Sequence, residues 1–519
     1  MREIDLAGRI GRLLTRHGFI ETPYIFPVVD PILREQYLPI NEILNAGFNG
    51  IMTNAYILKK HRGAVADIHD HLGFSGVVVT DSGAYQILRY GDVEVSNREI
   101  VQYQCEIKSD IGVILDIPTS SDVDRDAALK SADETYRRAV EVLDIVERCG
   151  DTLWTLPIQG GTHLDILRQY AERSVEVFYR GYSIYALGSP TTLLEQYDFD
   201  RIIDMIFAVR SIIPFSTPLH LFGAGHPLIV PFAAALGVDT MDSASYILYA
   251  KDDRYMGSRA TYRLEDLSYF PCTCPVCSKY SPEDVRRMPK RKRVELLALH
   301  NLHALSREFR EVKQAIKEGR LWEYLEDRAN SHPATRRAFE QLKRYLEFIY
   351  RHTPIVKPDA RAVFILSEDS IFNPKIMIPR RRVLERFDSE VECIDLIPYR
   401  RGEGFPDSGI GESKCASYIY FPILGIAPLH LVDRYPYSQF EFGFKVTDKI
   451  VSDLSYLIFE ALLKMLKISR TIVVNIYVCS NVEWQKELYR KLINLAQQVG
   501  ESSVKIVLKA AKCRLSAPG

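Results

Sequence analysis

Residues 77–83 read Val-Val-Val-Thr-Asp-Ser-Gly, a β-branched run followed by an acidic residue and two small turn residues. β-Branched residues favour strands, and a buried parallel strand is a short apolar run of this kind. The same order of strand-like run, small or polar turn and helical pattern recurs from about residue 75 to 250. This alternation predicts parallel strands joined by right-handed helical crossovers.

The expected strands are short β-branched or aliphatic runs bounded by turn residues. They cover 77–80, 111–117, 153–158, 182–187, 219–222 and a weaker run at 239–241. We expect the remaining units of the eight-stranded barrel to come from residues 50–53 and from the C-terminal helices. Polar residues follow nearly every strand, as a ring of loops at one barrel mouth would require. The pattern therefore favours an α/β fold with a (β/α)8 TIM barrel, although a doubly wound open sheet fits almost as well.

On such a barrel, the strand-end residues would converge on one cleft. They are Asp81, Ser82, Gly83, Asp116, Gln159, Gly160, Gly161, Gly188, Ser189, Gly223, Ala224, Gly225, His226, Asp242 and Ser243. An aspartate after a strand is more often a helix N-cap than a catalyst, so the hypothesis depends on the whole set.

The cleft carboxylates suit displacement at an anomeric carbon. One carboxylate can attack while a second moves a proton. A third can accept hydrogen bonds from the ring N–H and amine of a guanine-like base, and an aromatic side chain such as Tyr85 can stack on that base. The residues therefore indicate glycosyl chemistry on a purine nucleotide.

Three cysteines, Cys272, Cys274 and Cys277, follow a C-x-C-x-x-C spacing, and His300 lies on a predicted helix beyond them. Three thiolates and one imidazole form a closed tetrahedral Zn2+ site, with one ion per chain. His303, one turn further, is the alternative fourth ligand. Four protein ligands leave no open position for water, so we expect a structural zinc and assign the chemistry to the carboxylates.

Composition indicates a soluble globular protein of two or three domains. The chain has 519 residues, 47% of them hydrophobic, and a net charge of −1. This charge predicts no general affinity for nucleic acid. However, residues 286–293 contain six basic side chains, which form either a solvated face or a polyanion site. These are Arg286, Arg287, Lys290, Arg291, Lys292 and Arg293.

The sequence shows no recognisable signal peptide or membrane span, and this together with the cysteine usage favours a cytoplasmic protein with no membrane partner. No apolar stretch approaches the roughly 18 residues of a membrane span. The N-terminal 19 residues mix acids and arginines with apolar positions, which predicts an amphipathic helix rather than a signal peptide. The six cysteines outside the cluster are scattered, as suits a reducing compartment.

A linker-like segment at 352–358 suggests how the chain divides. Residues 1–350 would form the barrel domain, with a zinc subdomain inserted at about 270–310 and helices at 291–310 and 334–350. Residues 351–519 would form a smaller α/β domain. Its expected strands cover 361–366, 418–420 and 471–479, and its helices cover 452–466 and 482–499.

Taken together, several segments resemble the archaeal tRNA-guanine transglycosylases, the barrel enzymes of archaeosine synthesis. The resemblance covers about residues 1–350 and is carried by 77–86, 112–119, 157–161, 185–188, 220–227, 237–243 and 272–277 with 300–302. Residues 435–439, Tyr-Pro-Tyr-Ser-Gln, are similar to the first C-terminal domain of that family.

The resemblance implies a pentosyltransferase that replaces guanine at position 15 of the tRNA D-arm by 7-cyano-7-deazaguanine. Asp242 matches the nucleophile that attacks ribose C1′ and forms a covalent intermediate. Asp81 matches the residue that protonates the departing guanine and deprotonates the incoming base. Because older descriptions of the family call the residue matching Asp81 the nucleophile, both are candidate catalytic residues. Further substrate-binding positions are Ser82, Tyr85, Asp116, Gln159, Gly188 and Ser189.

The resemblance also implies partners. The target base must flip out of its stack to reach a barrel mouth, and the basic run becomes a candidate phosphate contact. A homodimer is expected. Residues 189–191, Ser-Pro-Thr, depart from the family pattern, and no C-terminal RNA-binding PUA domain is evident. Either the remaining basic surface binds tRNA, or a separate PUA protein assists.

Three rival hypotheses fit less well. A non-catalytic tRNA-binding subunit would lack the carboxylates, whereas Asp81, Asp116 and Asp242 are all present. The archaeosine synthase paralog carries a C-terminal Pro-Cys and Lys-Pro-Tyr…His pattern that is not visible here. A bacterial-type enzyme acting at the anticodon fits poorly, because the sequence around Asp116 and at 223–227 resembles the archaeal family members.

Overall fold

The computed structural model describes residues 3–34, 36–84, 94–188, 190–386, 391–399, 415–467, 471–498 and 504–511. Two of the predicted base contacts, Tyr85 and Ser189, lie outside these residues. The chain divides into two compact units, Met1–Pro354 and Ile355–Gly519.

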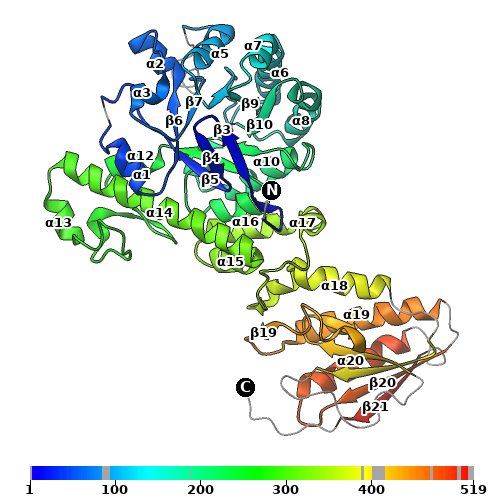
Figure 1. The fold of residues 1–519 in the computed structure, drawn as a ribbon. Helices are drawn as coiled ribbons and strands as arrows, with labels where there is room; N and C mark the ends of the chain where they lie inside the picture. Colours follow the sequence, from blue (N-terminus) through cyan, green and yellow to red (C-terminus); the bar gives the residue numbers. More distant parts are fainter. Residues whose placement is uncertain are drawn as a thin grey trace. The chain divides into compact units, whose positions relative to one another are not determined.

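The first unit contains a barrel of eight parallel strands in sequence order (Figure 1). The ends of the sheet meet where Val28 bridges to Met52, and the Val29 N–H donates to the Met52 carbonyl at 2.8 Å. This order and closure confirm the predicted TIM barrel. The strands are β5 (Tyr24–Pro27), β6 (Gly50–Asn54), β7 (Val77–Asp81), β8 (Ile111–Val113), β9 (Leu153–Ile158), β10 (Tyr182–Leu187), β11 (Leu219–Leu221) and β12 (Thr240–Ser243).

Seven of the barrel strands lie where the sequence predicts them, but the eighth does not come from the C-terminal helices. It is β5, near the N-terminus, and all four of its residues are buried. Pro23 precedes this four-residue run and Pro27 ends it, so it carries too little periodicity to be recognised as a strand. The strand expected at 111–117 is also shorter, because β8 ends at Val113.

Helices follow the strands and cover the outside of the barrel (Figure 1). Their apolar faces pack inward; in α5, for example, Ile100, Val101 and Tyr103 are buried. The helices are α1 (Ile40–Asn45), α2 (Ala55–Arg62), α3 (Ile68–Leu72), α5 (Asn97–Glu106), α6 (Arg125–Glu141), α7 (Leu143–Arg148), α8 (Leu164–Phe178), α9 (Thr191–Glu195), α10 (Phe199–Arg210), α11 (Val230–Ala235) and α12 (Ser245–Lys251).

The N-terminal segment forms two antiparallel hairpins, so the predicted amphipathic helix is wrong. β1 (Glu3–Asp5) pairs with β2 (Gly8–Ile10), and β3 (Arg12–Thr15) pairs with β4 (Gly18–Glu21). Gly18 has a φ of +126°, which a helix excludes. Arg9 anchors the first hairpin by donating to both carboxylate oxygens of Asp239, at 2.7 and 2.6 Å. Asp239 lies 230 residues away in the sequence, so the local sequence pattern around Arg9 could not reveal this contact.

An insertion after the barrel carries the cysteine cluster. Its elements are the hairpin β13 (Arg254–Met256) and β14 (Thr261–Arg263), the turn η1 (Leu264–Asp266), α13 (Pro282–Arg287) and the long α14 (Lys290–Glu318). α15 (Leu321–Ala329), α16 (Pro333–Lys343) and α17 (Leu346–His352) follow. The helix predicted at 291–310 is therefore part of α14, and the one predicted at 334–350 is two helices.

The second unit is an α/β sheet in the strand order β18-β17-β16-β20-β21. β18 runs antiparallel to β17, and the other pairs are parallel. The strands are β16 (Cys393–Pro398), β17 (Ala416–Phe421), β18 (Gly425–Pro428), β20 (Ile472–Val478) and β21 (Val504–Ala510). The remaining elements are β15 (Val363–Ile365) paired with β19 (Phe440–Phe442), η2 (Glu368–Phe372), η3 (Leu429–Leu431), α18 (Pro374–Glu385), α19 (Asp448–Leu466) and α20 (Glu483–Gln497).

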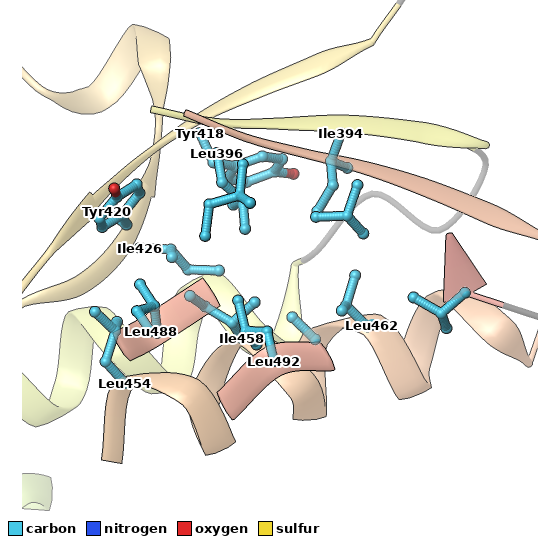
Figure 2. Close-up of a cluster of buried hydrophobic side chains, with 14 of the residues drawn as sticks. Ile394, Leu396, Tyr418, Tyr420, Ile426, Leu454, Ile458, Leu462, Leu488 and Leu492 are labelled. Atoms are coloured by element: carbon cyan, nitrogen blue, oxygen red, sulfur yellow. The ribbon is translucent and has the colours of Figure 1, made fainter. Parts of the chain in front are cut away.

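Apolar side chains of this sheet pack against α19 and α20 (Figure 2). Alternate strand residues, such as Ile397 and Ile419, enter a second cluster with β15, as the two-residue period of a strand requires. The labelled members of the first cluster are Ile394, Leu396, Tyr418, Tyr420 and Ile426 from the sheet, and Leu454, Ile458, Leu462, Leu488 and Leu492 from the helices. Among the described helices, none is long and apolar enough to cross a membrane.

Some of the scattered cysteines form disulfides, which contradicts the expectation of reduced thiols. Cys105 on α5 bonds to Cys149 at the end of α7, and Cys393 in β16 bonds to Cys415 beside β17. The partners are 44 and 22 residues apart, and sequence spacing alone does not reveal such pairings.

The Cys105–Cys149 disulfide is expected to stabilise the barrel unit by about 2–4 kcal/mol, because it restricts a long loop of the unfolded chain. We predict that the double variant Cys105→Ala, Cys149→Ala unfolds at a lower denaturant concentration than the wild type without reductant. With dithiothreitol the two proteins should unfold together. If the gap persisted in reductant, lost packing rather than the lost bond would be the cause.

Candidate active site and metal centre

Three predicted site aspartates lie at the carboxyl ends of barrel strands. Asp81 is the last residue of β7, Asp116 lies three residues after β8, and Asp242 is the third residue of β12. The charges of Asp116 and Asp242 both act on the Asp81 carboxyl. The barrel therefore brings the three carboxyl groups together at one mouth, as the sequence predicts.

Asp81 is held by donors to one of its carboxyl oxygens, Oδ2. Asn54 Nδ2 lies 3.2 Å from it and the Gly83 N–H donates at 3.3 Å. The Asn54 amide is oriented because its Oδ1 accepts the Ile57 N–H at the start of α2, at 2.9 Å. Burial, followed by the charges of Asp116 and Asp242, raises the pKa of Asp81 to about 7. Such a carboxyl can donate and accept a proton near neutral pH.

Asp242 occupies a different environment. Its Oδ1 accepts the Gly223 N–H at 2.9 Å and lies 3.0 Å from His220 Nε2. Neither contact involves Oδ2. The mouth thus combines one carboxyl whose pKa is raised to about 7 with one whose Oδ1 has two hydrogen-bond partners, an arrangement suited to a proton donor and a nucleophile.

A second set of polar contacts joins Asp116 directly to Gln159, the residue that follows β9. Gln159 Nε2 donates to Asp116 Oδ2 at 2.5 Å, and Gln159 Oε1 accepts the Thr119 N–H at 3.3 Å. Burial raises the pKa of Asp116 to about 6, although the Gln159 hydrogen bond opposes the shift. Gly188, after β10, approaches so closely that a Cβ there would lie 2.1 Å from Gln159 Nε2. Any larger residue at 188 would displace this amide.

Ser82 is completely buried, and its hydroxyl has no hydrogen-bond partner within the described part of the chain. Burying an unpartnered hydroxyl costs free energy. Its position next to Asp81 therefore offers a polar group to a bound molecule.

The four predicted metal ligands, Cys272, Cys274, Cys277 and His300, place their ligand atoms within 4.8 Å of one another. His300 Nδ1 lies 3.5 Å from Cys274 Sγ and 3.4 Å from Cys277 Sγ. Sulfur and nitrogen ligands at about 2.3 and 2.0 Å from one tetrahedral ion have separations of this size. The cluster can therefore hold a metal ion, and His303 is not among its four residues.

The orientation of the His300 ring also fits metal binding. Its Nε2 donates to the Met256 carbonyl at 2.9 Å, so Nδ1 is the nitrogen that can bind a metal. Tyr255 stacks on the ring, with the two ring centroids 3.7 Å apart. These contacts fix the imidazole independently of the cysteines.

Most of the basic run 286–293 makes contacts within the protein. Arg286 donates to the carbonyls of Leu264 and Leu267. Arg293 and Lys290 pair with Asp253, Arg287 with Glu283, and Lys292 with Glu295. Arg291 makes none of these contacts, so it is the member of the run that retains an uncommitted charge in the described chain.

Sequence reasoning missed two residues that contact the carboxylates, Asn54 and His220. Asn54 ends β6 just as Asp81 ends β7, so the strand-end rule could have found it. His220 lies within β11, where a histidine is indistinguishable from an ordinary core residue. Its approach to Asp242 depends on the pairing of β11 with β12.

Comparison with known proteins gives a consistent match. The sequence model of the queuine tRNA-ribosyltransferase family matches residues 5–334. The tRNA-guanine(15) transglycosylase of Saccharolobus solfataricus is 44% identical over 462 residues, 87% of this chain and 91% of that protein. That of Aeropyrum pernix is 42% identical over 505 residues, 93% and 95% of the two chains. That of Thermococcus kodakarensis is 40% identical over 442 residues, 84% and 70%.

The metal centre predicts about one bound metal ion per purified chain, measured by elemental analysis. Cys274→Ser should remove the ion, because it leaves only three of the four strong ligands. His303→Ala is the matched control, since it deletes a neighbouring imidazole outside the cluster and should leave the metal content unchanged. Full metal content in Cys274→Ser would contradict this assignment.

The raised pKa of Asp81 predicts a pH-dependent effect on stability. The carboxyl binds its proton more tightly in the folded than in the unfolded chain, so the free energy of unfolding falls as the pH rises from about 4 to about 7. Asp81→Asn removes this cost. The variant should match the wild type near pH 4 and exceed its free energy of unfolding at pH 8 by about 1–2 kcal/mol. Chemical unfolding at both pH values measures the difference, and an equal or lower stability at pH 8 would refute it.

Proposed function

The chain belongs to the queuine tRNA-ribosyltransferase family, and from this premise we propose that it replaces guanine at position 15 of the tRNA D-arm by 7-cyano-7-deazaguanine. It is a pentosyltransferase that exchanges guanine in tRNA. The names of the relatives, tRNA-guanine(15) transglycosylase, support the target position. The exchange would be a step of archaeosine biosynthesis in the cytoplasm.

The observation that carries the mechanism is the contrast between Asp81 and Asp242. Asp242, whose Oδ1 has hydrogen-bond contacts with the Gly223 N–H and His220 Nε2, is the proposed nucleophile. It attacks C1′ of the ribose as the bond to guanine breaks, which forms a covalent ribosyl-aspartate intermediate. The phosphodiester chain remains intact throughout.

Asp81 is the proposed general acid and base. Its carboxyl protonates the departing guanine, and the resulting carboxylate then takes a proton from the incoming base as that base attacks C1′. A pKa of about 7 suits both steps at neutral pH. The proton acquired in the second step restores the acid for the next cycle.

The base would be recognised by the polar group around Asp116. This carboxylate can accept hydrogen bonds from the ring N–H and exocyclic amine of guanine, while Gln159 and Ser82 offer further polar atoms. Gly188 keeps the Gln159 amide in place by its close approach. We also assign Tyr85 and Ser189 to this pocket, on the family resemblance alone.

The metal proposed for the cysteine cluster is Zn2+. When bound, it would crosslink the cysteine loop to α14 through four protein ligands, with no open position for chemistry. We also propose a homodimer and, for tRNA capture, either the protein's own basic surface or a separate PUA-domain protein. Within the run 286–293, Arg291 is the best candidate phosphate contact.

The function is tested by following radiolabelled guanine into unmodified tRNA. Asp242→Asn should lower exchange by about 10³-fold or more, because the variant lacks the nucleophile. Asp151→Asn is the control: this exposed carboxylate pairs with Arg16 and lies two residues before β9, at the amino end of the strand, and its loss should leave exchange unchanged. A tRNA with another base at position 15 should accept no label. Normal exchange by Asp242→Asn, or equal labelling of both tRNAs, would refute the corresponding assignment.

A further inference from the structure

We propose that His220 is a positioning residue, which holds the Asp242 carboxylate by donating from Nε2 while Thr240 engages Nδ1 and steadies the ring. This inference rests on the proposed role of Asp242. His220 does not touch substrate in this account; it acts only through the aspartate.

The three residues form a buried chain of polar contacts across two neighbouring strands. His220 Nδ1 lies 2.9 Å from Thr240 Oγ1, and His220 Nε2 lies 3.0 Å from Asp242 Oδ1. His220 and Thr240 are 4% and 2% exposed. They are direct partners in the register of β11 with β12, and Asp242 lies two residues further along, on the same face of β12.

The chemistry of these atoms selects one tautomer. An ionised carboxylate only accepts hydrogen bonds, so Nε2 must carry the proton in the contact with Asp242. In the neutral ring, Nδ1 is then an acceptor, and the Thr240 hydroxyl can donate to it. The carboxylate therefore selects the Nε2–H tautomer, and the Thr240 hydroxyl, which can donate or accept, satisfies Nδ1 and holds the ring in place.

This arrangement fixes one oxygen of the nucleophile and leaves the other for reaction. Oδ1 receives both the Gly223 N–H and His220 Nε2, so rotation of the carboxyl group is restricted. Phe222 packs edge-on to the imidazole, with ring centroids 4.8 Å apart, and holds it in place. Because both ring nitrogens are engaged, His220 has no nitrogen left for a proton transfer with substrate.

A buried histidine inside a barrel is commonly a core residue, and the variants must separate that role from positioning. Glutamine can place an amide N–H near the Nε2 position, asparagine near the Nδ1 position, and leucine fills volume without donating. If His220 only fills space, the kcat values of the variants should follow how well each side chain fits and how stable each protein is. If His220 positions Asp242, the kcat values should depend on whether a hydrogen-bond donor still reaches that carboxylate.

We expect His220→Asn and His220→Leu to lower kcat of guanine exchange by about 10- to 100-fold, the usual cost of one hydrogen bond to a charged group. KM for tRNA should stay within about twofold. His220→Gln should retain kcat within about fivefold of the wild type, because it restores the donor. Thr240→Val should give a smaller loss, since Nδ1 then lacks its partner and the ring is held less firmly.

Catalysis must also separate from stability, as a packing role would not allow. His69→Leu is the matched control, because His69 is also buried and contacts a carboxylate, Asp110, which lies directly before β8 at the amino end of that strand. It should lower stability but leave kcat within about threefold of the wild type.

The outcomes separate the two proposals. An active wild type with equal kcat values for His220→Leu and His220→Gln, or a loss of kcat in His69→Leu as large as that in His220→Leu, would overturn the positioning role alone. A wild type that exchanges no guanine would overturn the proposed function and this inference with it. Rescue by glutamine, with KM for tRNA unchanged, would support both.

Discussion

Closure of the parallel barrel is the constraint on which the site depends. When Val28 and Met52 join β5 to β6, the eight strands must all run in the same direction around one axis. Their carboxyl ends then lie on one rim, and residues far apart in sequence, such as Asp81 and Asp242, face a common mouth. The Arg9–Asp239 ion pair supports this arrangement, because it ties the N-terminal hairpin to the residue that precedes β12.

Local environment suits two chemically identical side chains to the different roles proposed for them. Asp81 is enclosed beside two other carboxyl groups, and burial together with their charges raises its pKa to about 7. Asp242 has its Oδ1 contacted by Gly223 and His220. Dividing acid and nucleophile in this way is a general solution for pairs of carboxylates at one reacting centre. The candidate metal cluster lies outside the proposed division, since four protein ligands on one ion would leave no open position for chemistry.

Prediction from the sequence succeeded where the signal was local. The runs ending at Asp81 and Ile158 are bounded by turn residues, so the strands and the polar residues after them could be recognised. The C-x-C-x-x-C spacing identified three members of the candidate metal cluster in the same way. Failure occurred where the information was non-local: the short, proline-flanked β5, the N-terminal hairpins held by distant Asp239, and the disulfide partners of Cys105 and Cys393. His220 belongs to this second class, because only the strand register brings it to Asp242.

The most direct test of the central claim is to locate the covalent bond. The enzyme would be incubated with substrate tRNA, quenched in acid, digested with nuclease and protease, and examined by tandem mass spectrometry for a ribosylated peptide. We expect the adduct on Asp242, within the peptide that contains β12. An adduct on Asp81 would contradict the assignment of nucleophile and acid.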